Sequence, residues 1–284
     1  MQPSDPVSQL LERIHIDADT FFAGSLCGQP VFQAHAEMGH LHLVRSGSLT
    51  ISHPQLDTLL VSGPTLLFYP RAIAHQLHIA DDAAIDVVCA NIRYGSSLQH
   101  ALTQSLPALL AVPLAEAPAA HNTLALIFDE AAGHLPGRRT MLNRLNEALL
   151  ILLIRHALAQ RQVKTGLLAG LTHPRLGAVL AEMLAAPEAD WQLADLARRC
   201  HYSVNRLIDV FKRVVGQTPG TLLAQLRIGK AQGLLAQGVP LAVVAQKAGY
   251  GSQPAFSRAF IRVVGSPPSV WLRLAAAGPE AARV

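Results

Sequence analysis

A helical pattern occurs twice between Trp191 and Trp271, and it constrains the possible fold more than any other feature of the sequence. The first copy, LADLARRCHYSVNRLIDVFKRVVG, begins at Leu193, and the second, LAVVAQKAGYGSQPAFSRAFIRVVG, begins at Leu241. Equivalent residues lie 48 or 49 positions apart, because one residue is inserted in the second copy. Two similar segments at so short a period indicate two copies of one supersecondary unit.

Each copy predicts a short apolar helix, a break and a second, amphipathic helix. In the first copy the break ends at Ser203, whose side chain can cap the next helix by accepting a backbone hydrogen bond. Apolar residues then recur with helical spacing at Leu207, Val210, Phe211 and Val214. This arrangement is the helix-turn-helix pattern, whose second helix enters the major groove of DNA. A helical repeat with solvated charged faces would show the same periodicity.

The distribution of charge favours a nucleic-acid partner. Residues 171–284 contain 13 Lys and Arg against 6 Asp and Glu, whereas residues 1–170 contain 10 against 13. The whole basic excess of the chain, formally +4, therefore lies in the half that holds the repeat. A basic surface on one domain is the expected electrostatic footprint of a DNA-binding protein.

Several segments of this half resemble the DNA-binding domain of AraC/XylS-type transcription regulators. They are FKRVVGQTP from Phe211, LRIGKAQGLL from Leu226, AxxxGYGSQPAFSRAF from Ala245 and GSPPSVWLR ending at Arg273. The resemblance covers about residues 172–274. It implies a domain over 172–275, with helix-turn-helix units at about 191–216 and 239–265 that flank a central helix over 222–235. It also implies double-stranded promoter DNA and RNA polymerase as partners, and an activator.

The same resemblance assigns DNA contacts by position. Arg258 and Gln253 have the side chains best suited to reading bases, whereas Ile208 and Pro254 cannot hydrogen-bond a base and Asp209 could accept only from cytosine. The base-reading positions are Asn205, Ile208 and Asp209 in the first copy and Gln253, Pro254, Ser257 and Arg258 in the second. The expected phosphate contacts are Arg206, Lys212, Arg213 and Arg262.

The N-terminal half shows a different pattern, of short strands separated by Gly, Pro and Asp. The predicted strands are His40–Val44, Ser48–Ile51, Leu59–Val61, Thr65–Tyr69, Ala74–Ile79 and Ile85–Ile92, with Gly47 in the turn between the first two. Short strands at regular spacing indicate a sandwich or small barrel. The segment GSLTI…LLVSGPTLLFYPRAIAHQLHI resembles the cupin-type sensing domain of many AraC-family regulators, over about residues 8–105. We therefore expect an α+β multidomain chain whose residues 1–105 form a cupin-like barrel with an interior pocket.

Candidate chemistry in this barrel rests on histidine and cysteine. His40 and His42 are two residues apart and so share one face of a strand. His75 lies where cupins often place a metal-ligand histidine, and Cys89 follows on a later strand. Together these four residues are candidate ligands, for which zinc is the best match. The alternative is redox sensing by Cys27, His42, His75 and Cys89, similar to an AraC-family branch that responds to reactive chlorine species. Two other interpretations remain open. The barrel could hold a small-molecule pocket, or the cysteine and histidine side chains could be part of the core only.

Residues 106–165 are expected to form a helical region. Leu106–Pro118 is predicted to include a short helix, and Arg139–Gln160 one long helix with a broad apolar surface. By resemblance, the long helix forms a homodimer interface, although it could instead pack on the barrel. A helix over His173–Leu184 is predicted to open the DNA-binding domain.

Other properties of the sequence indicate the cellular compartment and the class of protein. We find no signal-peptide pattern, and the longest apolar run, Ala148–Ile154, is far too short to span a bilayer. Three widely spaced cysteines, of which Cys200 is predicted to be core, do not suggest a disulfide framework. These features indicate a cytoplasmic protein without a membrane partner. The rival interpretation is a metal-dependent cupin enzyme with a helical appendage, but Glu37 precedes the His40-x-His42 pair instead of following it.

Overall fold

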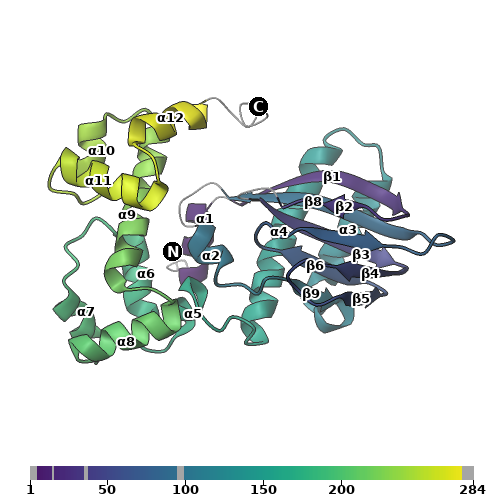
Figure 1. Ribbon diagram of the computed structural model, residues 1–284, viewed down its shortest axis with the longest axis horizontal. Coiled ribbons are helices and arrows are strands. Elements are labelled where there is room, and N and C mark those ends of the chain that lie inside the picture. Colours follow the sequence, from purple (N-terminus) through teal and green to yellow (C-terminus); the bar gives the residue numbers. More distant parts are fainter. Residues whose placement is uncertain (1–4, 15, 35–37, 95–98, 277–284) are drawn as a thin grey trace. The chain divides into compact units, whose positions relative to one another are not determined.

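The computed structural model describes residues 5–14, 16–34, 38–94 and 99–276, and it divides into two compact units (Figure 1). The strand unit consists of residues 16–95 and 106–163, and the helical unit of residues 1–15, 96–105 and 164–284. This division differs from the expected one, because two segments of the N-terminal half group with the helical unit. The α+β architecture is as predicted.

Two antiparallel sheets form the strand unit. Sheet A has the order β1-β8-β3-β6-β9 and sheet B the order β2-β7-β4-β5. The strands of sheet A are β1 (Ile16–Leu26), β8 (Ile85–Tyr94), β3 (Met38–Ser46), β6 (Thr65–Tyr69) and β9 (Leu110–Pro113). Those of sheet B are β2 (Val31–Phe32), β7 (His75–His78), β4 (Ser48–Ser52) and β5 (Leu59–Ser62).

The two sheets share one buried core. Val44 and Val87 of sheet A and Ile51 and Leu77 of sheet B belong to the same cluster of buried residues. Alternate residues of each strand supply this core, as the period of two predicts. At Gly47, where φ is +95°, the chain passes from β3 in sheet A to β4 in sheet B, so these two strands are not partners.

Two predictions about the edges of sheet A were wrong. The segment Leu106–Pro118, expected to include a helix, forms β9 and a 3₁₀ turn (Leu114–Glu116), because Leu110 and Val112 are buried where β9 pairs with β6. The first predicted strand was His40–Val44, after Cys27, whereas the sheet already begins with a strand that ends just before Cys27. That strand, β1, lacks a clear apolar alternation and is held by its pairing with β8 along its length.

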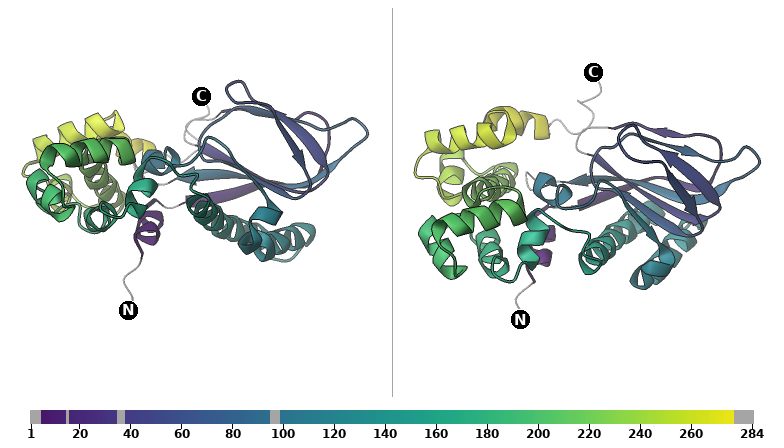
Figure 2. Two further views of the ribbon diagram at one scale, coloured as in Figure 1. Left: turned by 90° about the horizontal axis from the view of Figure 1, so that it is seen from below. Right: turned by 60° about the horizontal axis from the view of Figure 1, so that its bottom comes forward.

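Two helices lie against β1 on one side of the sheets (Figure 2). They are α3 (His121–Ala132), which follows a second 3₁₀ turn (Pro118–Ala120), and α4 (Arg138–Ala159). The long helix expected over Arg139–Gln160 is thus shifted by one residue at each end. Leu142, Leu149 and Leu153 of α4 are buried, whereas Met141 and Ile151 on its other side are exposed.

The helical unit contains the repeat. Its C-terminal helices are α7 (Leu193–Arg199), α8 (Val204–Val215), α9 (Pro219–Ala236), α10 (Leu241–Lys247), α11 (Gln253–Val264) and α12 (Pro268–Ala276). In the second copy, Phe256 and Phe260 of α11 pack with Val244 of α10 and Ile228 of α9 in one buried cluster. The helix-turn-helix pairs are α7–α8 and α10–α11, as the repeat predicts.

Matching caps bound the second helix of each copy. Ser203 Oγ accepts a hydrogen bond from Arg206 N at 3.3 Å, which confirms the predicted cap, and Ser252 Oγ accepts from Ala255 N at 3.4 Å. Gly216 and Gly265 end the two helices with φ of +80° and +83°. The turn before each cap also matches, since His201 has φ of +54° where the second copy has Gly249 at +81°.

Two helices of this unit differ from the sequence prediction in their bounds. The central helix α9 has 18 residues, or about 27 Å. It begins before the predicted Leu222 because Thr218 Oγ1 caps it by accepting from Thr221 N. The helix predicted over His173–Leu184 begins four residues later, as α6 (Gly177–Ala185), because His173 Nδ1 accepts backbone hydrogen bonds from residues 175 and 176. A separate helix, α5 (Leu167–Thr172), precedes it.

Two helices from the N-terminal half complete the helical unit. Leu10 and Ile14 of α1 (Pro6–Ile14) are fully buried, and α1 contacts α5 and α6. After α2 (Gln99–Thr103), Ser105 Oγ accepts a hydrogen bond from Leu168 N at 3.3 Å. Among the described residues, no helix has the length and apolar character needed to cross a bilayer.

We predict that Gly249→Ala destabilises the helical unit. At φ of +81° a side chain is strained, and the added Cβ would lie 2.7 Å from the carbonyl oxygen of Glu188. The free energy of unfolding should fall by about 1–3 kcal/mol. Thermal unfolding followed by circular dichroism measures the change. The matched control is Gly233→Ala within α9, where a Cβ meets no atom within 4 Å and a gain of about 0.5–1 kcal/mol is expected. Equal effects of the two substitutions would contradict the prediction.

Candidate functional site

Three of the predicted sensing residues lie side by side inside the strand unit. His42 on β3 and Cys89 on β8 are directly opposite each other in the strand register, and their Nδ1 and Sγ atoms are 3.1 Å apart. The other ring nitrogen of His42, Nε2, is 2.8 Å from His75 Nε2 on β7. All three side chains are buried. Residues from both sheets therefore form one continuous chain of hydrogen bonds.

The backbone determines where the protons of this chain lie. His75 Nδ1 is 2.9 Å from the carbonyl oxygen of Ile73, which can only accept, so Nδ1 must carry the proton. In neutral His75 the other nitrogen, Nε2, then accepts from His42 Nε2–H. His42 Nδ1 is left with its lone pair and accepts from the Cys89 thiol. The resulting order is thiol to His42 to His75 to carbonyl.

Burial keeps these groups uncharged. It raises the pKa of the Cys89 thiol far above its usual value and lowers the pKa of His42 well below 6.5. The pKa of His75 falls to about 4, mainly through burial, although its bond to Ile73 opposes that shift. Near neutral pH the resting site therefore holds a thiol and two neutral imidazoles.

His40 extends the site into a candidate metal centre. One nitrogen from each of His40, His42 and His75 lies within 4.8 Å of the others, and all three side chains are buried. Neutral imidazoles suit zinc, and the bond from His75 Nδ1 to a carbonyl is the usual support for a metal-ligating histidine. Cys89, the fourth ligand assigned from the sequence, does not belong to this group, because its Sγ contacts Nδ1 of His42 and not the Nε2 that faces His75. Glu37, the acidic residue considered from the sequence, lies outside the described residues.

Aromatic rings enclose the imidazoles. The ring of His75 lies between Tyr69, with centroids 4.1 Å apart and planes at 9°, and Phe32, at 5.0 Å and 13°. Phe32 also packs its edge against His42 at 4.6 Å. The Tyr69 hydroxyl donates to His53 Nε2 at 2.9 Å, since His53 Nδ1 must donate to the carbonyl oxygen of Asp57. Sequence spacing gave no signal for Phe32, Tyr69 or His53.

Cys27 is not part of this cluster. It is exposed and follows the end of β1, whereas the residue of β1 opposite Cys89 is Phe22. Five residues of extended chain span about 16 Å, well beyond the Cα separation of about 4.4–6.8 Å that a disulfide needs. In this structure Cys27 and Cys89 therefore cannot pair.

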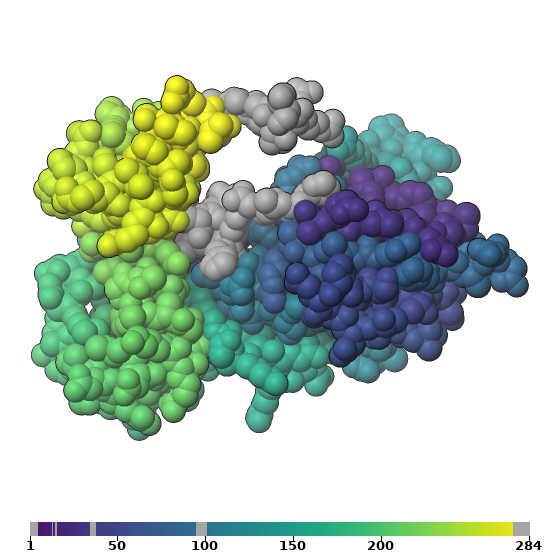
Figure 3. Space-filling view, in the orientation of Figure 1, coloured from purple at the N-terminus to yellow at the C-terminus, as the bar shows by residue number. Residues whose placement is uncertain are grey.

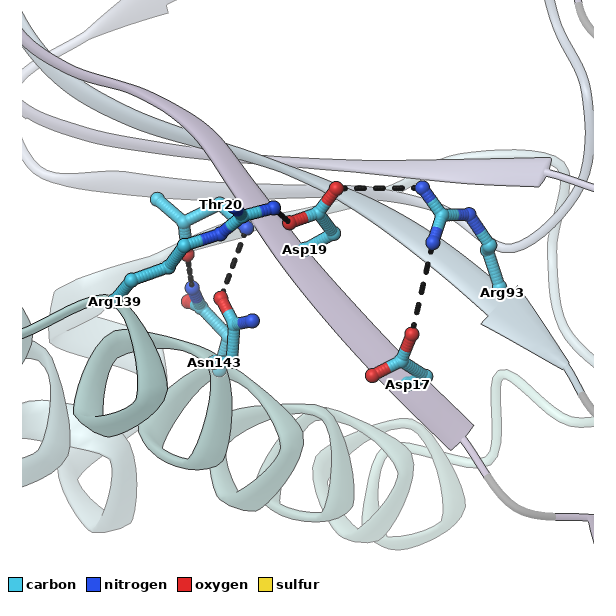
Figure 4. A network of polar contacts seen from close by, with 7 residues as sticks. Asp17, Asp19, Thr20, Arg93, Arg139 and Asn143 are labelled. Atoms are coloured by element: carbon cyan, nitrogen blue, oxygen red, sulfur yellow. Dashed lines mark hydrogen bonds and ion pairs between the residues drawn. The ribbon is translucent and has the colours of Figure 1, made fainter. Parts of the chain in front are cut away.

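A polar network next to the site ties β1 to helix α4. The ladder between β1 and β8 shifts register between Thr20 and Phe22, a β-bulge. There the Thr20 backbone N–H donates to Asn143 Oδ1 at 3.0 Å, and Asn146 Nδ2 donates to Thr20 Oγ1 at 3.0 Å (Figure 4). Arg139 Nη2 also donates to Asp19 at 2.7 Å, and Arg93 reaches the other oxygen of that carboxylate. Cys89 thus lies opposite the segment of β1 that is hydrogen-bonded to α4.

The predicted DNA contacts lie on the outer sides of α8 and α11. The atoms of α7 to α12, in green to yellow, are closely packed in Figure 3. Beneath them the apolar faces of α8 and α11 are buried. Ile208 and Ser257 are half-buried, and the other assigned side chains are exposed: Asn205, Arg206, Asp209, Lys212, Arg213, Gln253, Pro254, Arg258 and Arg262.

Eight cations of this unit form two groups that differ in their carboxylate partners. Arg198, Arg199 and Lys230 pair with Asp195, Glu182 and Glu188, so they stabilise the fold locally. In the described part of the chain, no carboxylate forms an ion pair with the five basic residues assigned to DNA, which are Arg206, Lys212, Arg213, Arg258 and Arg262. Cations without a carboxylate partner are the ones available to phosphates and base edges.

Comparison with known proteins matches both halves. A family described as Cupin matches residues 5–159, and one described as Helix-turn-helix domain matches residues 196–274. RclR of Escherichia coli (strain K12), an "RCS-specific HTH-type transcriptional activator", is 29% identical over 232 residues, which are 80% of this chain and 81% of RclR. AlkR of Acinetobacter baylyi, an "HTH-type transcriptional regulator", is 26% identical over 302 residues, covering 93% of this chain and 97% of AlkR. The solved structure of ToxT from Vibrio cholerae O395 has a TM-score of 0.40 at 13% identity, covering 90% of this chain and 96% of that one.

We predict that acid destabilises the metal-free strand unit through its buried histidines. An unfolded histidine binds a proton below about pH 6.5, whereas folded His75 binds one only near pH 4. The free energy of unfolding should therefore be highest above pH 6.5 and should fall as the pH drops toward 4, by up to about 3 kcal/mol for His75 alone.

Urea unfolding in the presence of a chelator, at several pH values, measures this dependence. The control is His75→Gln, which removes the titrating group. Acid also protonates carboxylates, so the difference in pH slope between the two proteins is the relevant quantity. Identical slopes would show that His75 does not titrate as described.

Proposed function

Because this chain belongs to the AraC family of helix-turn-helix transcription regulators with an N-terminal cupin domain, we propose that it is an activator controlled by its buried Cys89–His42–His75 site. It is a DNA-binding transcription regulator, and its relatives are regulators, not enzymes. The observation that carries the proposal is the chain of hydrogen bonds from the Cys89 thiol through both imidazoles. A sensing role accounts for this chain of hydrogen bonds without a bound substrate or an enzymatic acid or base.

The signal that we favour is an oxidant of the reactive chlorine class. The name of RclR, "RCS-specific" activator, agrees with this choice. In hypochlorous acid the chlorine is electrophilic. Cys89 Sγ would attack that chlorine while its proton passes to His42 Nδ1, and hydroxide would leave. Water would then replace chloride on sulfur to give sulfenic acid and HCl. Although burial raises the pKa of the thiol, the adjacent imidazole can take the proton as the S–Cl bond forms.

A metal signal is the second candidate, and the three-histidine cluster favours it. His40, His42 and His75 would hold the ion, and Cys89 would contact Nδ1 of His42 instead of the ion itself. A bound zinc ion would supply a fixed positive charge that ties sheet A to sheet B. The two candidates differ in their need for His40, which belongs to the ligand cluster but not to the Cys89–His42–His75 chain.

Transmission of the signal would run through β1 to helix α4. A change in size or charge at Cys89 would act on Phe22, its neighbour across the ladder. Phe22 adjoins the bulge and is two residues from Thr20, which Asn143 and Asn146 hold. The exposed side chains Met141 and Ile151 support a homodimer interface on the outer side of α4. Altered packing of α4 would then change how two copies present their DNA-reading helices.

At the promoter, α8 and α11 would enter successive segments of the major groove and the protein would recruit RNA polymerase. The exposed base-reading side chains Gln253 and Arg258 make α11 the better equipped of the two helices. The site of action would be the cytoplasm, where promoter DNA lies.

Replacement of Arg258 by Ala should weaken binding to a selected DNA site by about 1–3 kcal/mol and relax its sequence preference. Arg206→Ala should instead weaken binding to all sequences about equally and reduce the salt slope by about one. Fluorescence anisotropy at several salt concentrations, on a site selected from a random pool and on a scrambled site, measures both effects. The matched control is Arg198→Ala, whose guanidinium is already paired with Asp195. Equal loss on both DNAs for Arg258→Ala would refute base reading.

Replacement of Cys89 by Ser should abolish the transcriptional response to hypochlorous acid in a reporter strain. The hydroxyl keeps the hydrogen bond to His42 but cannot be oxidised in this way. The variant His40→Gln separates the two candidate signals, since it should spare an oxidant response and eliminate bound zinc measured by elemental analysis. An unaltered response in Cys89→Ser, with no metal bound to the wild-type protein, would remove Cys89 from the mechanism.

A further inference from the structure

The sensing site is closed to solvent. His42 is 0% exposed, Cys89 1%, His75 2% and His40 3%. A reactant or ion must therefore displace a side chain to reach them. The rings in contact with the imidazoles, Tyr69, His53 and Phe32, are the candidates for that side chain among the described residues.

Phe32 covers more of the site than any other described ring. Its centroid lies 4.6 Å from that of His42, 5.0 Å from His75 and 5.9 Å from His40. The ring is itself only half-buried, and on its outer side it meets Phe21, which is 46% exposed. One partly exposed side chain thus contacts all three imidazoles.

The backbone that carries Phe32 is lightly held. Strand β2 has only two residues, lies at the edge of sheet B and pairs with β7 alone. Just before it, the carbonyl oxygens of Gly28 and Pro30 also accept from Ile79 N and Leu77 N, whereas no such bond is found on the chain after Phe32 among the described residues. An edge strand this short can move away after losing few backbone hydrogen bonds, so local opening there is favoured. Phe32 is also opposite His75 in the register, and its movement would uncover that ring directly.

The other two rings are fixed more firmly. Tyr69 is fully buried on β6, which has strand neighbours on both sides, and its hydroxyl is bonded to His53. His53 is half-buried but is held at both ring nitrogens, by Tyr69 and by the carbonyl oxygen of Asp57. Opening on this side would break more interactions than movement of Phe32.

We propose that Phe32 is the access residue of the sensing site, and that its ring limits the site to small reactants such as hypochlorous acid or a bare metal ion. Bulky electrophiles and thiols, which need a wider opening, are excluded. This inference rests on the proposed function only in identifying the Cys89 site as the sensor. The role of Phe32 is one of selectivity, since the ring takes no part in the chemistry.

The three cysteines of the whole 284-residue chain provide the test. With a chelator present, the protein is alkylated with iodoacetamide or with a maleimide attached to polyethylene glycol, and each cysteine is followed by mass spectrometry. Exposed Cys27 serves as the fast reference, and buried Cys200, in the helical unit, as the slow one. Phe32→Ala should accelerate labelling of Cys89 by at least about tenfold, and more so for the bulky maleimide. Phe32→Trp should slow it below the wild-type rate, a result that an unfolded barrel could not give.

The matched controls are Phe21→Ala, which removes the outer exposed ring, and His53→Ala, which opens the opposite side. Both should leave the Cys89 rate within about twofold of wild type. An unchanged Cys89 rate in Phe32→Ala, no slowing in Phe32→Trp, or equal acceleration by His53→Ala would overturn the proposal. The labelling requires neither DNA nor a transcriptional response, so its failure is distinct from a failure of the proposed function.

Discussion

One hydrogen bond, from His75 Nδ1 to the carbonyl oxygen of Ile73, determines the chemistry of the buried site. A carbonyl cannot donate, so this bond sets the tautomer of His75, then that of His42, and finally directs the Cys89 thiol proton toward an imidazole. Because the carbonyl belongs to the backbone, no side-chain substitution elsewhere in the site reverses this order. The same bond orients His75 between Tyr69 and Phe32, so proton positions and ring packing have a common origin.

The surrounding sheets turn that local chemistry into a structural signal. His42 and His75 lie in different sheets, so any event that alters their 2.8 Å contact acts on both sheets together. Next to them, β1 is the edge strand of sheet A, and the Thr20 N–H beside its bulge donates to Asn143 of α4. An edge strand leaves alternate N–H groups without a strand partner. One of these groups fastens the helix to the strand that lies next to the thiol.

The sequence predicted best where periodicity and local chemistry agreed. The repeat, the Ser203 cap and the long helix α4 follow from spacing alone, and the two-residue interval of His40 and His42 placed both on one face. Prediction failed where tertiary pairing overrode composition. Strand β1, which has no clear apolar alternation, and strand β9, which lies in a Leu- and Ala-rich segment, form because they pair with β8 and β6. Phe32, Tyr69 and Ile73 were missed because only the folded sheets bring them to the histidines. Cys27 was grouped with the site because the sequence does not show where β1 ends or how β1 is aligned with β8.

The helical unit is assembled from three separate stretches of chain, and this affects how such a protein can be taken apart. A fragment beginning at Lys164 would lack α1 and α2, and with them Leu10, Ile14 and Ser105, which occupy its interior. Such a fragment would expose the surfaces of α5 and α6 that α1 contacts. A chimera that exchanges sensors between relatives would need four junctions, not one. A single crossover between two related genes would therefore combine parts of one unit from different parents, whereas replacement of both units together keeps each unit intact.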